Sequence, residues 1–215
     1  MKRPTDRLPL SILLWTCLAA GLLLSGCVAG GDRVTQFYTL ESLAPPRQPS
    51  ATGAKAGTAP LAVEVAALRL PQYLERPQIV TRRDGNRLFL SEFNQWGGNL
   101  QKDLMRTMAL NFSLLLDTPQ VSITPYHPPT PPDYRVEVEI MRFEQEENGE
   151  VTLLAQWRLL QRQAKEAVAT RMTTLSGTPS SSTDAYAGTV ATMSRLWGEL
   201  CTIIAQAMQQ DARGR

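Results

Sequence analysis

Alternating apolar and polar residues mark three consecutive segments in the second half of the chain as strands. The alternation is regular in 133–144, turns at Asn148-Gly149, and continues through 151–161 and 165–175. The residues expected on the buried face of the first two strands are Tyr134, Val136, Val138, Ile140, Val151, Leu153, Ala155, Trp157 and Leu159. This pattern predicts an antiparallel meander with one face on the core and the other toward water or a partner.

Shorter strands are predicted at 61–70 and at 121–124. The first alternates only partly, and its expected inward-facing residues are Leu61, Val63, Val65 and Ala67. Two further segments, 78–81 and 87–90, are rich in β-branched or apolar residues and are separated by Asp84-Gly85-Asn86. These turn residues can supply the positive φ that a tight hairpin needs, so we predict a β-hairpin here.

Apolar residues three and four positions apart predict two long amphipathic helices. The first is expected to open at 92–96 and to carry an apolar stripe along 94–117, and the second is expected over 184–211 with Ser182 or Thr183 as its N-cap. The stripe residues are Trp96, Leu100, Leu104, Met108, Phe112 and Leu115 in the first helix, and Tyr186, Val190, Met193, Trp197, Leu200, Ile204 and Met208 in the second. Together with the strands they predict an α+β fold, a mainly antiparallel sheet with two long helices packed on one face.

The N-terminus has the organisation of a secretory signal peptide of the lipoprotein type. Residues 1–7 are basic, 8–24 are almost wholly apolar, and the run ends in Leu24-Ser25-Gly26-Cys27, which matches the bacterial lipobox. We therefore expect a signal peptide at 1–26 and acylation of Cys27 by chains such as palmitate. The alternative is an uncleaved membrane anchor, but the apolar run is shorter than the ~20 residues that a spanning helix needs. Because Val28 and not Asp follows the cysteine, the expected location is the inner leaflet of the outer membrane.

The mature chain is expected to begin with an acylated tether at 27–36. A single periplasmic domain at 37–215 follows, with a flexible loop rich in Pro, Gly and Ala at 44–60. Loss of the signal peptide leaves 19 basic and 19 acidic side chains from the original 22 and 20, a balance that does not favour binding to nucleic acid. Cys17 leaves with the signal peptide, and Cys201, in an apolar helical segment, is expected to be a buried structural thiol.

Groupings of residues that carry catalysis or bind cofactors are scarce in this sequence. Its single histidine, His127, lies in a proline-rich loop without a Gly-x-Ser-x-Gly motif, so we interpret it as solvated and disfavour a periplasmic hydrolase. No metal-binding motif or Gly-rich phosphate loop is present, and the acidic run 144–147 is interpreted as a solvated hairpin turn. We therefore expect no enzymatic activity, no metal and no cofactor.

The segment 70–82, which reads LPQYLERPQIVTR, carries a resemblance to a known family. Followed by the predicted hairpin and by NQWGGNL at 94–100, it resembles the ABC-type transport auxiliary lipoprotein family, as does the early Phe37-Tyr38-Thr39-Leu40. One departure is Gly97-Gly98, where better helix formers are expected. The resemblance implies an outer-membrane-anchored periplasmic lipoprotein that is a non-catalytic accessory component of an ABC/MCE-type intermembrane lipid transport system.

The same resemblance implies partners. They are an MCE-domain protein that bridges the periplasm, an inner-membrane permease and ATPase that are reached indirectly, and further copies of the chain in a homo-oligomer. A monomeric periplasmic lipid-binding carrier remains open as an alternative function. Such a carrier needs a continuous apolar cavity able to bury most of a lipid, whereas a docking protein has a filled core.

The loop before the hairpin is the predicted partner-binding surface. Pro71 and Pro77 restrict its conformations, while Tyr73 and Arg76 are residue types that often carry interface energy. The full predicted set is Arg69, Pro71, Tyr73, Leu74, Arg76, Pro77, Gln78 and Arg82. Its arginines suit an acidic partner or phospholipid headgroups, or form a solvated face. Alternatively, Tyr73 and Leu74 fold inward and cap the core.

Overall fold

The computed structural model describes residues 34–43, 60–126, 131–162, 167–179 and 184–214. The elements in chain order are β1 (Gln36–Tyr38), β2 (Val63–Arg69), the 3-10 turn η1 (Gln72–Leu74), β3 (Gln78–Arg83), β4 (Arg87–Trp96), α2 (Leu100–Leu115), β5 (Val121–Ile123), β6 (Tyr134–Gln145), β7 (Val151–Gln161), β8 (Ala167–Gly177) and α3 (Ala185–Arg213). The predicted signal peptide, Cys27, His127 and nearly all of the predicted 44–60 loop lie outside the described residues. None of the helices in the described ranges is long and apolar enough to cross a membrane.

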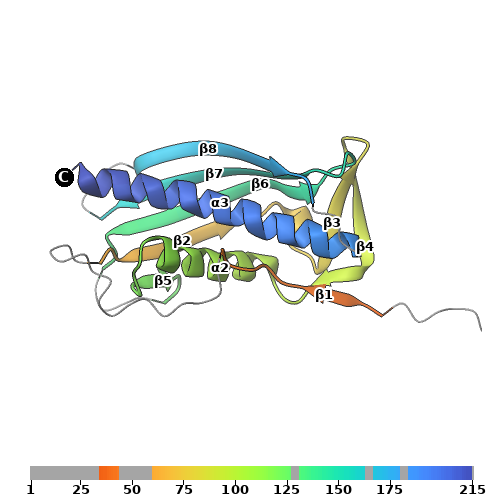
Figure 1. The fold of residues 1–215 in the computed structure, drawn as a ribbon, viewed down its shortest axis with the longest axis horizontal. Coiled ribbons are helices and arrows are strands. Elements are labelled where there is room, and N and C mark those ends of the chain that lie inside the picture. Colours follow the sequence, from red (N-terminus) through yellow and green to blue (C-terminus); the bar gives the residue numbers. More distant parts are fainter. Residues whose placement is uncertain (1–33, 44–59, 127–130, 163–166, 180–183, 215) are drawn as a thin grey trace, which may run out of the picture. The chain divides into compact units, whose positions relative to one another are not determined.

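Strand β6 is the centre of the sheet. It pairs in parallel with β2 and antiparallel with β7. β5 extends the sheet beyond β2 in parallel, and β8 extends it beyond β7 in antiparallel orientation. The predicted meander of β6, β7 and β8 is therefore confirmed, and its ladders are the longest in the sheet (Figure 1).

The β3–β4 hairpin and β1 form a smaller part of the same sheet. β3 and β4 pair antiparallel, and β1 runs parallel to β4. Asp84 and Gly85 make the hairpin turn with φ of 49° and 68°, so the predicted positive-φ turn is confirmed. A single parallel pair between Thr81 and Gln145 links β3 to β6.

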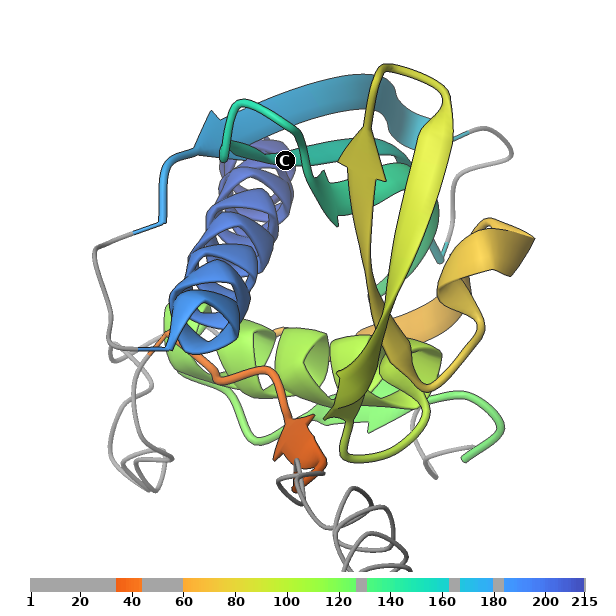
Figure 2. The same ribbon diagram turned by 90° about the vertical axis from the view of Figure 1, so that its right-hand side faces the viewer.

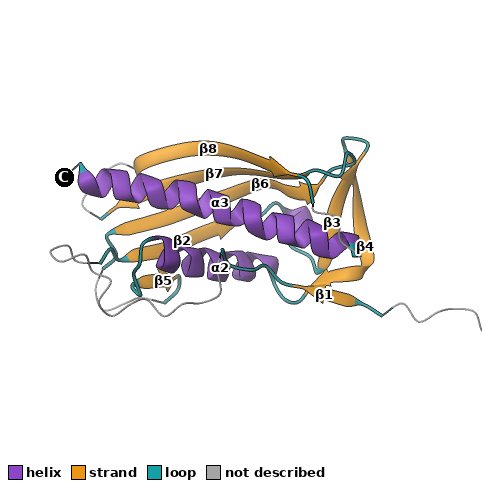
Figure 3. Ribbon diagram, in the orientation of Figure 1, coloured by secondary structure: helices purple, strands orange, loops and turns teal. Residues whose placement is uncertain are grey.

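Both helices lie on the concave side of the curved sheet (Figures 2 and 3). α2 packs on β2 and β5, and α3 packs on β6, β7 and β8. The largest fully buried side chains come from both layers and include Phe112, Tyr134, Phe143, Trp157 and Trp197. The indole Nε1 of Trp197 donates a hydrogen bond to the Leu104 carbonyl at 3.1 Å and so joins the two helices. The α+β fold with two long helices on one sheet face is confirmed.

The first helix begins later than the sequence predicts. Residues 92–96 continue β4, and α2 starts at Leu100. Gly97 and Gly98 lie between the strand and the helix, and because glycine is a poor helix former, the helix begins only after them. The Asn99 side chain then caps the helix by accepting the Lys102 N–H at 2.9 Å. Trp96 stays in the sheet, where its N–H bonds to the Pro77 carbonyl at 2.7 Å.

Two smaller predictions are also wrong. The pairing of β2 with β6 shifts register between Val65 and Ala67, so that Leu68 rather than Ala67 is buried. The N-cap of α3 is Asp184 and not Ser182 or Thr183. Its carboxylate accepts the Tyr186 N–H at 2.9 Å, because it immediately precedes the first helical residue.

Candidate functional site

The predicted partner-binding loop connects β2 to β3 through η1. Two backbone bonds shape it: Leu74 N–H to the Pro71 carbonyl at 2.9 Å, and Glu75 N–H to the Gln72 carbonyl at 3.2 Å. Of the predicted set, the exposed members are Arg69, Arg76 and Pro77, and the half-buried members are Pro71, Tyr73, Gln78 and Arg82. Leu74 is only 3 % exposed and belongs to the core, as the inward-folding alternative expects for this residue.

A buried carboxylate fastens this loop to the sheet. Glu144 of β6 is fully buried and accepts four hydrogen bonds. Its Oε2 accepts the Tyr73 hydroxyl and the Phe143 N–H, each at 2.8 Å. Its Oε1 accepts the Nε of Arg82 at 2.7 Å and the Nε of Arg142 at 3.3 Å. We call Tyr73, Arg82, Arg142 and Glu144 the buried joint.

The interpretation of 144–147 as a solvated turn is therefore wrong for Glu144, which is buried, and for Gln145, which is the last residue of β6. Glu144 lies inside β6, whose register with β7 shifts between Ile140 and Arg142. Tyr73 and Arg82, from the loop and from β3, close over the carboxylate. Glu147 is exposed, as a turn residue should be, and accepts the Asp84 N–H at 3.1 Å.

Ionisation in the buried joint follows from burial and from the charge of Glu144. Burial raises the pKa of the Tyr73 phenol, and the hydrogen bond to the Glu144 carboxylate raises that pKa further. For Arg82, burial lowers the pKa, but the hydrogen bond and charge of Glu144 outweigh it, so the pKa lies above its ordinary value. Tyr73 thus stays neutral and Arg82 stays charged at neutral pH, as a structural anchor requires.

Two shallow hollows lie beside the start of α2. One, of about 140 Å³, is lined by the loop residues Leu70, Glu75, Arg76 and Pro77 and by 98–101. The other, of about 220 Å³, lies between β1 and α2 and is mostly apolar, with Tyr38, Trp96 and Leu100 in its lining. Gly98 and Leu100 line both hollows, so the two hollows adjoin each other at the start of α2.

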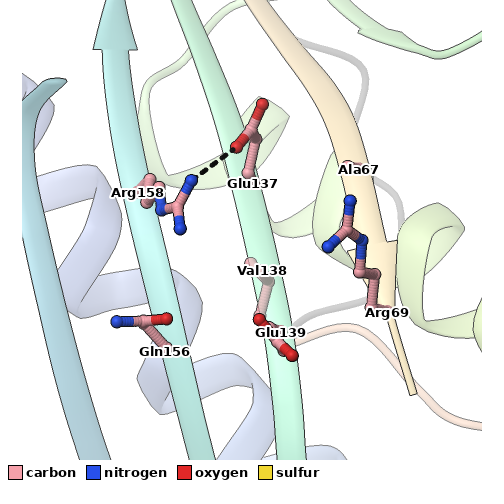
Figure 4. Close-up of a pocket in the computed structure, with 7 residues that line it drawn as sticks. All are labelled: Ala67, Arg69, Glu137, Val138, Glu139, Gln156 and Arg158. Carbon is pink, nitrogen blue, oxygen red and sulfur yellow. Dashed lines mark ion pairs between the residues drawn. The ribbon is translucent and has the colours of Figure 1, made fainter. Parts of the chain in front are cut away.

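The outer face of the sheet carries a second charged cluster, which is more exposed to water than the buried joint (Figure 4). Side chains from β2, β6 and β7 surround a hollow of about 90 Å³, and its polar members are Arg69, Glu137, Glu139, Gln156 and Arg158. Arg158 Nη1 lies 3.9 Å from Glu137 Oε2, and both side chains are at least one-third exposed. Arg69, a predicted site residue, therefore faces this cluster and not the buried joint.

The described residues offer little for metal or thiol chemistry. Within them, no group of three or more His, Cys, Asp and Glu could hold a metal ion. Cys201 is buried, as predicted, and burial raises its pKa to about 12. Asn111 Nδ2 lies 3.6 Å from its sulfur. The thiol is therefore protonated and shielded, which suits a packing role and not a nucleophile.

Sequence reasoning missed Glu144 and Asn99. Glu144 stands in an acidic run next to a turn, and no local signal separates it from the solvated Glu147. Asn99 did carry a signal, because an N-cap residue after two glycines and before an apolar stripe marks a helix start.

Fold and surface together define an α+β domain with a filled core and shallow surface hollows. The particular family follows from the sequence: the model of the ABC-type transport auxiliary lipoprotein component matches residues 38–205, and the chain belongs to this family. Comparison with curated proteins gives no match.

Solved structures share this fold at low sequence identity. A crystal structure of an uncharacterized protein is 18% identical, with a TM-score of 0.62, covering 81% of this chain and 99% of the other. A Xanthomonas campestris protein of family DUF330 is 21% identical, with a TM-score of 0.60, covering 84% of this chain and 97% of the other. At these identities the likeness shows the fold alone.

Proposed function

We propose that this protein is a non-catalytic accessory lipoprotein of an ABC/MCE-type intermembrane lipid transport system. Acylated Cys27 anchors it in the outer membrane, with the domain on the periplasmic face. Membership of the ABC-type transport auxiliary lipoprotein family supports the accessory role. The lipobox and Val28 support the anchor and its membrane.

The filled interior is the observation that decides between the two candidate functions. It favours a protein that docks to a partner over a carrier that holds a lipid inside. Buried aromatic and aliphatic side chains occupy the space between sheet and helices, and those of Leu104, Met108 and Trp197 are each 0 % exposed. A hollow of about 460 Å³ beside the two hairpins has a mixed lining, in which charged residues such as Arg83 and Glu147 stand beside Ala185 and Tyr186. An acyl chain needs a continuous apolar cavity, which this charged lining does not provide.

The partner surface that we propose is the loop with the start of α2. Arg76 and Pro77 are exposed there and border a hollow, while the buried joint holds Tyr73 and Arg82 behind them. A loop already held in one conformation loses less entropy on binding than a mobile one. Its partner is an MCE-domain protein of the periplasm.

Capture of that partner tests the surface. Arg76→Ala should weaken capture by about tenfold, because arginine is enriched among the few interface residues whose truncation costs well over 1 kcal/mol. The thermal midpoint should barely move, since Arg76 is exposed. Arg162→Ala removes another exposed arginine, beyond β7, and serves as the matched control. Equal capture by both variants would refute the proposed surface.

The double variant Tyr73→Ala with Arg76→Ala distinguishes a role of the loop in binding the partner from a role in stabilising the fold. Tyr73 belongs to the buried joint, so this double variant should lose stability as well as capture. If capture per folded molecule equals that of the unaltered protein, then the loop serves the fold and not the contact.

Fractionation of cells tests the anchor. Cys27→Ser should move the protein from the outer membrane to the soluble periplasm, because the thiol is the proposed site of acylation. A variant that still fractionates with the outer membrane at the original level would refute anchoring through Cys27.

A further inference from the structure

One end of the domain gathers β1, the β3–β4 hairpin and the start of α3 (Figures 1 and 2). The hydroxyl of Tyr38 in β1 donates to Asp184 Oδ2 at 2.6 Å, which ties β1 to the start of α3. Arg83 of the hairpin and Tyr186 of α3 line the same hollow. These contacts bring together elements that are far apart in the sequence.

Two phenylalanines are exposed at this end. Phe37 of β1 is 66 % exposed, and Phe89 of β4 is 43 % exposed. Neither side chain is needed to fill the core. Other residues of the same part of the sheet, such as Trp96 of β4 and Val80 of β3, already do so. Single exposed apolar side chains are ordinary on a protein surface, but two large rings at one end leave apolar area that a contact can cover.

Basic groups accompany the exposed rings. The guanidinium of Arg83 lies over the Phe89 ring, 4.6 Å from its centroid. Arg87, the first residue of β4, pairs with Asp84. An aromatic ring with an arginine over it matches the boundary of a bilayer, where rings enter the headgroup region and arginine meets lipid phosphate.

The covalent chain limits how far this end can lie from the lipid anchor. Nine residue steps separate Cys27 from Gln36, the first residue of β1. A chain spans at most about 3.3–3.6 Å per residue, so β1 begins within roughly 30 Å of the acylated cysteine. This short tether keeps β1 close to the bilayer and therefore allows the β1 and hairpin end to reach it.

We infer that Phe37, Phe89 and Arg83 form a membrane-docking end that rests on the leaflet holding the acyl chains. This inference deepens the proposed function, because it rests on acylation of Cys27. The rings enter the headgroup region and Arg83 binds lipid phosphate. Docking at this end leaves the far ends of β6, β7 and α3 pointing into the periplasm.

Site-selective quenching on vesicles tests the docking. Full-length acylated protein is placed in phosphatidylethanolamine–phosphatidylglycerol vesicles that contain a lipid-linked quencher. A fluorophore is attached at Asn86→Cys, in the hairpin turn, or at Gln206→Cys, which is exposed on α3 about 30 Å along the helix from its start. Native Cys201 is buried and stays unlabelled. We expect strong quenching at position 86 and little at 206.

Removal of the rings is the decisive comparison. Phe37→Ser with Phe89→Ser should lower the docked population about tenfold, because each ring then gains no apolar burial on docking. Tyr126→Ser is the matched control, since Tyr126 is also 66 % exposed but follows β5, which is not one of the elements gathered at this end. This control should leave the quenching at position 86 unchanged.

Vesicle flotation separates the two proposals. All variants should float, because Cys27 is intact. Floating protein with equal quenching at 86 and 206, or with quenching that survives loss of both rings, would overturn the docking and leave the anchor standing. Protein that does not float would overturn the anchor through Cys27 and the docking with it.

Discussion

In each of two charged clusters, a glutamate of β6 pairs with arginine, but the two glutamates differ in burial. Glu144 belongs to the buried joint, where it is fully buried beneath Tyr73 and Arg82. Glu137, earlier in β6, pairs with Arg158 across the strand pair at 3.9 Å, and we call these two residues the open pair (Figure 4). Both side chains of the open pair remain in contact with water, whereas the Glu144 carboxylate of the buried joint does not.

The difference teaches that burial, and not the presence of opposite charges, decides what an ion pair contributes. In the open pair, water screens the charges, and fixing two long side chains costs entropy that offsets the attraction. In the buried joint, Glu144 is fully buried, so each of its four hydrogen-bond donors replaces a hydration contact that the carboxylate loses on folding. The open pair adjusts a surface, whereas the buried joint holds the loop of the proposed partner site.

Removal of the buried carboxylate should have the largest effect. Glu144→Ala is expected to lower the free energy of unfolding by about 3–5 kcal/mol, because it leaves Arg82 and Tyr73 without their partner. Urea or guanidinium unfolding measures the change. Glu137→Ala is the matched control on the same strand and should change stability by less than about 1 kcal/mol. Similar losses in the two variants would contradict the comparison.

Loss of one hydroxyl from the buried joint should have an intermediate effect that depends on pH. Tyr73→Phe removes a hydrogen bond to a charged group and should cost about 1.5–3 kcal/mol at neutral pH. The folded pKa of Tyr73 lies above its ordinary value of about 10, so its contribution is complete below pH 10.

The sign of the alkaline effect follows. Above pH 10 the unfolded chain releases the Tyr73 proton while the folded chain keeps it, so stability falls as pH rises. Tyr73→Phe should therefore show a shallower alkaline loss than the unaltered protein. Unfolding curves from pH 8 to 11 measure this difference, and equal slopes would refute the assigned role of the hydroxyl.

Coupling across the open pair should be the smallest effect. A double-mutant cycle with Glu137→Gln and Arg158→Gln should give a coupling of about 0.2–1 kcal/mol that shrinks at high salt. The same cycle on Glu144 and Arg82 should give a larger coupling that salt hardly changes, because that pair is shielded. Equal salt dependence of the two couplings would contradict the role assigned to burial.

The sequence by itself determined the elements that local periodicity encodes. Alternation in β6 and β7 identified their buried faces, and apolar residues three and four apart identified the buried stripes of α2 and α3. The turn at Asp84-Gly85 and the buried state of Cys201 were also predictable. In each case the signal lies within a few neighbouring residues.

Only the tertiary structure decided where β4 ends and what Glu144 does. Residues 92–96 read equally well as a helix start, but backbone bonds from Trp96 to Pro77 and from Gly97 to Tyr38 hold the end of β4 in the sheet. Glu144 is buried because Tyr73 and Arg82, 71 and 62 residues earlier, close over it. A local pattern cannot encode such partners, because the fold brings them together only after the chain has paired its distant strands.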